Sequence, residues 1–103
     1  MKVSRNWLQK YFSEPLPNTE GIADAFTFHS FEVEEIEGDV FEVKVLPNRA
    51  SDCLCHRGLA RELSAILDVP LSDDPLRNPL PENIAGTASL TVTIEDAEKC
   101  LRY

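Results

Sequence analysis

The hydrophobic pattern after Ser4 has helical spacing. The apolar positions are Trp7, Leu8, Tyr11 and Phe12. Serine is a residue type that caps helix N-termini, and Pro15 and Pro17 end the pattern. A short amphipathic helix is therefore predicted to follow Ser4.

A second helical pattern follows these prolines. It begins at Asn18 or Thr19, carries Glu20 in its first turn, where the helix dipole favours an acid, and ends near His29. The residues that it is expected to bury are Ile22, Ala25 and Phe26. The sequence thus predicts two short helices before residue 30.

Residues 31–45 change to an alternating pattern, which predicts a β-hairpin with its turn at Gly38-Asp39. Regular pairing outward from this turn would mix apolar and charged side chains on one face. One extra residue near Glu34 or Glu35, a β-bulge, restores a continuous apolar face. The pairs then expected are Ile36 with Phe41, Val33 with Val43, Glu32 with Lys44 and Phe31 with Val45.

The longest helical pattern follows Pro47-Asn48-Arg49. We expect Asp52 to cap this helix, which runs to about Leu67. Its apolar face consists of Leu59, Leu63, Ile66 and Leu67, and another face carries Arg57, Arg61 and Ser64. The two arginines on one face are typical of a nucleic-acid recognition helix as well as of a solvated surface.

Four of the seven prolines fall between residues 70 and 81, which predicts an extended linker from about residue 69. Residues 89–95 alternate as a strand with no partner nearby. We therefore expect a domain over 1–85, with the start of a second domain over 86–103. The predicted fold class is α+β: a small three-helix domain with a β-hairpin, winged-helix-like, followed by a linker and the first strand of a second domain.

The net charge of −8 over 103 residues argues against attraction of the whole chain to nucleic acid. The charge is unevenly distributed, however. Residues 14–42 contain nine acids and no Lys or Arg, whereas residues 44–61 contain four basic residues and one acid. No apolar run is long enough to cross a membrane, so a cytoplasmic protein with no membrane partner is expected.

The candidate chemistry lies around Cys53, Cys55 and His56, because thiolates and imidazoles bind zinc and form nucleophile–base pairs. Their spacing is poor for zinc, and only the distant Cys100 and His29 could complete a site. No orienting acid or oxyanion site is evident. We expect no metal site and no catalytic residue. The acidic run is interpreted as a solvated face, with a Mg²⁺ or Ca²⁺ site as the alternative.

Several segments, in order, resemble the N-terminal region of bacterial phenylalanyl-tRNA synthetase β subunits. These are MKVSRNWLQKYF, IADAFTFHSFEVEEIE, PNR with the following Asp-Cys-Leu and GLARE, and TVTIEDAEKCLRY. Three features depart from the family pattern. Leu101 replaces a usual proline, the stretch from Arg49 to Asp52 is one residue longer, and the OB-fold domain of about a hundred residues usually inserted in the hairpin is missing.

The resemblance implies a non-catalytic structural domain of a subunit in an α₂β₂ ligase. That enzyme attaches phenylalanine to tRNA using ATP and Mg²⁺, with the α subunit and tRNA as partners. Residues 86–103 would open an editing-type (B3/B4-like) domain, with the editing residues beyond Tyr103. An independent winged-helix-like nucleic-acid-binding module is the alternative, and a zinc-binding adaptor is a third hypothesis.

The most specific motif is expected to have structural roles. Pro47 would fix the turn, and Asn48 and Arg49 would tie the loop to neighbouring elements. Asp52 would cap the helix, and Gly58 would allow close helix packing. Candidate contacts with RNA or a subunit are Lys44, Arg57 and Arg61.

Overall fold

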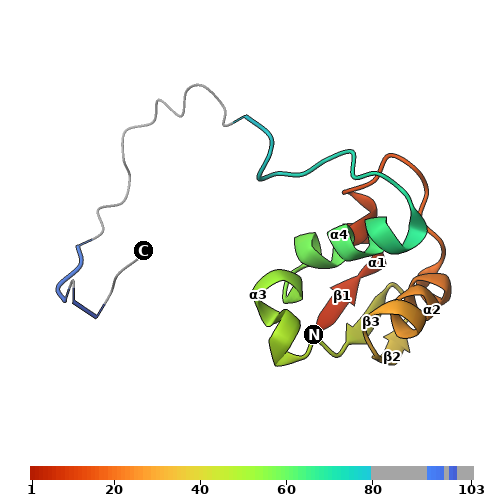
Figure 1. Cartoon of the computed structure of the whole chain (residues 1–103), viewed down its shortest axis with the longest axis horizontal. Coiled ribbons are helices and arrows are strands. Elements are labelled where there is room, and N and C mark those ends of the chain that lie inside the picture. The colour runs from red at the N-terminus through yellow and green to blue at the C-terminus, as the bar shows by residue number, and fades with distance from the viewer. Residues whose placement is uncertain (80–92, 97, 100–103) are drawn as a thin grey trace.

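The computed structural model describes residues 1–79, 93–96 and 98–99, and its regular elements lie within the first 67 residues. In chain order they are β1 (Lys2–Ser4), α1 (Arg5–Gln9), α2 (Thr19–His29), β2 (Val33–Glu37), β3 (Val40–Val43), the 3₁₀ helix η1 (Pro47–Arg49), α3 (Ala50–Cys53) and α4 (His56–Leu67). Figure 1 shows them gathered in one body, which confirms a mixed α+β domain.

The first two helices begin where their capping residues predict. The Ser4 hydroxyl accepts the Trp7 N–H, and the Asn18 side chain accepts the Gly21 N–H. The first helix is shorter than its apolar spacing indicates, because it continues beyond Gln9 only as single turns that reach Phe12. Phe12 is still buried, whereas Trp7 is 55% exposed.

The hairpin has the predicted turn, register and bulge. Val33 pairs with Val43 and Ile36 with Phe41, and the register shifts between Val33 and Glu35. Gly38 at the turn has φ +60°, a left-handed conformation that glycine adopts without strain. Beyond the ladder, the Lys44 N–H donates to the Glu32 carbonyl, which extends the pairing as expected.

The sheet has a third strand that the sequence pattern did not indicate. β1 pairs antiparallel with β3, which gives the order β1-β3-β2. The pairing is extended by the N-terminal ammonium, which donates to the Val43 carbonyl, and by the Val43 N–H, which donates to the Met1 carbonyl. Three residues are too few to show an alternating pattern, and their partner lies some forty residues away.

The prediction that Asp52 caps the longest helix is wrong. Residues 50–53 form the separate helix α3, and Leu54 then leaves the helical conformation with ψ 42°. Cys55 is extended and caps α4 instead, since its sulfur accepts the Gly58 N–H. The expected three helices therefore become four α-helices within the described residues.

The core lies where the helices pack on the sheet. α2 packs on β2 and β3, and α4 packs against α1, α2 and α3. The fully buried large side chains are Val3, Leu8, Ile22, Phe26, Phe41, Val43, Cys53, Leu59 and Leu63. Ala25 is only partly buried, and Ile66 and Leu67 pack at the edge of this core.

The segment after α4 lies against the domain as far as Asp74, whereas residues 75–79 are exposed. Val69 and Leu71 pack on the core, and the Ser72 N–H donates to the Tyr11 carbonyl. The division at residue 85 lies outside the described residues. So do residues 89–92 of the predicted strand, while Thr93–Glu95 are not in a strand.

The hairpin turn is bonded to the start of both early helices. Asp39 accepts the Ser4 hydroxyl at 2.6 Å and the Asn6 N–H at 3.0 Å, and its carbonyl accepts the Arg5 N–H. The Thr19 hydroxyl donates to the Gly38 carbonyl at 3.0 Å. The short turn therefore caps α1 and fixes the start of α2.

Replacing Asp39 by alanine should lower the free energy of unfolding by about 1–2 kcal/mol, because α1 loses a carboxylate cap and Ser4 loses its partner. Urea unfolding followed by circular dichroism measures this effect. Glu37→Ala, at an exposed acid two residues earlier, is the control and should change the value by less than about 0.5 kcal/mol. Equal effects in the two variants would contradict a capping role.

Candidate functional site

Arg49 joins four elements at one corner of the domain. Its Nη2 lies 2.9 Å from Asp52 Oδ2, 2.8 Å from Glu62 Oε2 and 3.1 Å from Cys53 Sγ. Its guanidinium also lies over the Phe31 ring, 5.4 Å from the centroid. We call these five residues the Arg49 corner; it links η1 to α3, to α4 and to the start of the hairpin.

The electrostatics of the Arg49 corner favour a fixed ion network over a reactive thiol. Hydrogen bonding to Arg49 lowers the pKa of Asp52 and keeps its carboxylate charged. Burial, with a smaller contribution from Asp52, raises the pKa of Cys53 to about 11. The Cys53 thiol is therefore protonated at neutral pH and is a poor nucleophile.

The other motif residues surround this corner. Pro47 occupies the first turn of η1, and Asn48 is exposed and makes no side-chain hydrogen bond within the described ranges. Gly58 lies directly on α3: a Cβ there would be 1.7 Å from the Asp52 carbonyl oxygen and 2.9 Å from Cys53 Cα. Only glycine fits at this helix contact.

Two of the three candidate RNA-contact cations are already paired within the domain. Lys44 lies 3.3 Å from Glu32 and 3.2 Å from Glu34. Arg57 makes two 2.7 Å hydrogen bonds to Asp74. Arg61 is exposed, and no ion pair of its side chain is found in the part of the chain that the structure describes. The structure therefore does not bring the three cations together as one free basic face.

Asp74 is a functional partner that the sequence pattern does not indicate. It lies 17 residues after Arg57, in the segment whose prolines predict an extended linker, and it is only 9% exposed. Hydrogen bonding to Arg57 lowers its pKa and raises that of Arg57. No local pattern could have shown this pairing, since the partner depends on the path of the chain after α4.

The cysteine–histidine candidates also have structural roles. The His56 ring stacks on Trp7, with centroids 4.3 Å apart and planes 17° from parallel, and its Nε2 accepts the Ser4 N–H at 3.2 Å. Burial lowers the pKa of His56, which favours the neutral ring that this bond requires. With Cys55 capping α4, the two residues do not form a nucleophile–base pair.

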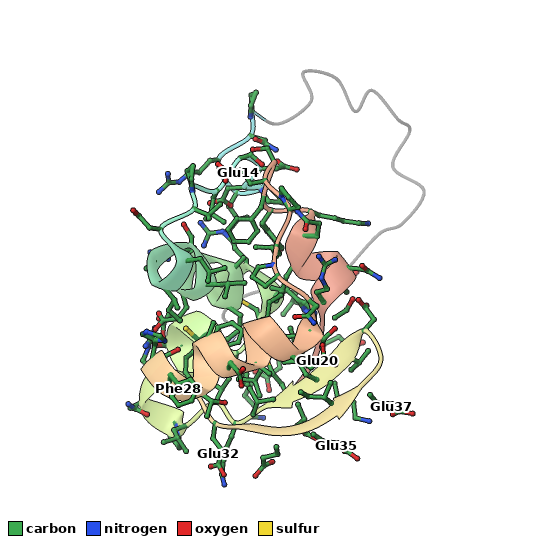
Figure 2. The ribbon with its side chains drawn as sticks, turned by 90° about the vertical axis from the view of Figure 1, so that its right-hand side faces the viewer. Glu14, Glu20, Phe28, Glu32, Glu35 and Glu37 are labelled. Atoms are coloured by element: carbon green, nitrogen blue, oxygen red, sulfur yellow. The ribbon has the colours of Figure 1, made fainter. Side chains whose placement is uncertain are left out.

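No group of three metal-ligating side chains comes together within the described residues, and Cys100 lies outside them. The acidic residues are spread over a broad surface instead. Figure 2 shows Glu20, Glu32, Glu35 and Glu37 projecting outward from α2 and the hairpin, with Phe28 exposed on the same side. This arrangement is that of a solvated face. No helix in the described residues is long and apolar enough to cross a membrane.

Sequence comparison connects this domain to a known family. The chain is 37% identical, over all of its length, to the phenylalanine–tRNA ligase β subunit of Rhodopirellula baltica. It is 45% identical to that of Syntrophotalea carbinolica over 71% of the chain, and 42% identical to that of Thermotoga maritima over 62%. The chain is related by sequence to phenylalanine–tRNA ligase β subunits. The resemblance carried by its motifs is thereby confirmed.

The chain spans a small part of these β subunits: 15% of the R. baltica protein and 9% of the S. carbinolica protein. The R. baltica match extends over 111 aligned positions against 103 residues here. This segment of the relative therefore has no room for an inserted domain of about a hundred residues.

No family model matches the chain. No solved structure matches it either, so the winged-helix-like assignment gains no support from a structural neighbour. The observed order, with the hairpin between α2 and α3 and a third strand ahead of α1, is that of a mixed α+β domain.

Replacing Arg49 by alanine should lower the urea midpoint at pH 7, because Asp52 and Glu62 lose their shared cation. It should also flatten the acid dependence of stability. The depressed pKa of Asp52 stabilises the wild type above about pH 4, and this stabilisation is lost as the pH falls through the lower folded value. Urea unfolding at pH 7, 5, 4 and 3 measures both effects.

Arg61→Ala is the matched control, since Arg61 is an exposed arginine on the same helix as Glu62. It should leave both the midpoint and the pH profile near those of the wild type. The role given to the Arg49 corner would be contradicted if Arg49→Ala had a urea midpoint close to that of the wild type and the same dependence of stability on pH.

Proposed function

We propose that this chain is the N-terminal structural domain of the β subunit of a phenylalanine–tRNA ligase. The whole enzyme would attach phenylalanine to tRNA using ATP and Mg²⁺ in the cytoplasm. The observation that carries the proposal is the 37% identity to one such β subunit along the entire chain. The matching order of the motifs along the chain supports it further.

A scaffolding role accounts for the way the side chains are used. The Cys53 thiol is buried beside Arg49, Cys55 caps α4, and His56 is held by Trp7 and Ser4. These groups stabilise the domain and leave no free nucleophile–base pair among them. In this proposal aminoacylation takes place on the α subunit, and residues 86–103 open an editing-type domain.

The proposal gives this domain a limited role in binding tRNA. Lys44 and Arg57 are neutralised by carboxylates of the same domain, and the large acidic face would repel phosphate. Arg61 is the candidate cation that has no ion-pair partner among the described residues, so a contact with tRNA or with another part of the ligase is assigned to it. This distribution of charge favours the ligase scaffold over an independent nucleic-acid-binding module.

The test is co-expression of the complete natural reading frame that contains this chain with the phenylalanine-activating α subunit of the same genome. A β subunit should co-purify with α as an α₂β₂ complex that charges tRNA with phenylalanine. Arg61→Gln should weaken the interaction with tRNA or the assembly, whereas Lys10→Gln, at the exposed lysine that directly follows α1, is the control.

Failure of the two proteins to associate would overturn the proposal. So would a reading frame that stops soon after Tyr103, together with tight, salt-dependent binding of nucleic acid by the isolated chain. That second outcome would support the independent binding module instead.

A further inference from the structure

We propose that residues 69–78 form a strap, clamped to the domain by the Arg57–Asp74 pair, which fixes where and in which direction the chain leaves the domain. The prolines of this segment predict an extended linker, and hydrogen bonds and an ion pair hold it to the domain as far as Asp74. The inference concerns the chain itself and does not depend on the proposed ligase function.

The clamp is a two-pronged ion pair. Arg57 Nε lies 2.7 Å from Asp74 Oδ1, and Arg57 Nη2 lies 2.7 Å from Asp74 Oδ2. Oδ1 also accepts the Leu76 N–H at 3.2 Å. With Asp74 only 9% exposed, this carboxylate is held on both oxygens away from bulk water. A planar guanidinium fits this geometry and an ammonium does not.

A second set of contacts holds the strap before the clamp. Asp68, with φ 54°, ends α4, and the next residue, Val69, exchanges hydrogen bonds with Ser64 through its N–H and its carbonyl. The Ser72 N–H then donates to the Tyr11 carbonyl at 2.9 Å. Figure 2 shows the segment beside the loop that carries Glu14, which follows α1.

The strap ends in a turn organised by Asp74 itself. The Asp74 carbonyl accepts the N–H groups of Arg77 and Asn78 at 2.8 Å and 3.2 Å, and the Asn78 amide donates to Asp73. Asp74 thus bonds the helix with its side chain and the turn with its main chain. The direction of the chain at the turn is therefore tied to α4.

The anchor on α4 is itself rigidly placed. Arg57 lies between His56, which stacks on Trp7 of α1, and Gly58, which packs on the α3 backbone. A movement of the strap would have to break the ion pair or shift the start of α4. The Arg57–Asp74 clamp consequently couples the position of the strap at Asp74 to the orientation of α1, α3 and α4.

Hydrogen–deuterium exchange of the full 103-residue chain, resolved by peptide mass spectrometry, tests the strap. Peptides that cover residues 71–78 should exchange at least tenfold faster in Arg57→Lys and Asp74→Asn than in the wild type. Arg61→Lys, one turn further along α4, is the matched control and should not differ from the wild type. The exchange of α2 peptides in the same samples shows whether the domain remains folded.

The double variant Arg57→Asp, Asp74→Arg reverses the pair and should recover a large part of the lost protection. Unchanged exchange over 71–78 in both single variants, with α2 still protected, would overturn the proposal. The proposal would also be overturned if the amides of residues 71–78 in the wild type exchanged as fast as those of an unstructured peptide of the same sequence. If α2 loses protection as fast as the strap does, the pair is part of the core and the strap does not exist as a separable unit.

Discussion

The contact between Gly58 and the Asp52 carbonyl is the constraint on which the rest of the structure depends. At this point the backbones of α3 and α4 approach so closely that no side chain fits between them. After Leu54 leaves the helical conformation, the absence of a side chain at Gly58 lets the first turn of α4 pack directly on the α3 backbone. Glu62 can then reach Arg49, His56 can stack on Trp7, and Arg57 can meet Asp74. One small residue thus positions three long-range interactions.

The features predictable from the sequence are those whose determinants are close along the chain. Ser4 and Asn18 cap their helices through residues three positions away, and the bulge near Glu34 follows from matching apolar faces across a two-residue turn. The missed features depend on distant partners. β1 needs β3, and the capping of α4 by Cys55 rather than Asp52 follows from the packing at Gly58.

The candidate site shows the same difference between features with local determinants and features with distant partners. The motif around Arg49 could be recognised as structural, but its partner Glu62 is 13 residues away and Arg57 meets Asp74 across a proline-rich segment. Three of the four basic residues between 44 and 61 therefore form ion pairs within the domain. Charge counted along a chain overestimates the cations that are free for RNA, because it cannot show which of them a folded domain neutralises.

The Gly58 contact organises this domain, and the unfolding free energy of Gly58→Ala tests this dependence most directly. Gly38→Ala is the comparison, since that glycine has φ +60° with open space around it and alanine there should cost roughly 1–2 kcal/mol. Gly58→Ala should cost clearly more, above about 3 kcal/mol, or fail to fold, because the clash is with backbone. A cost for Gly58→Ala equal to or below that of Gly38→Ala would contradict the account.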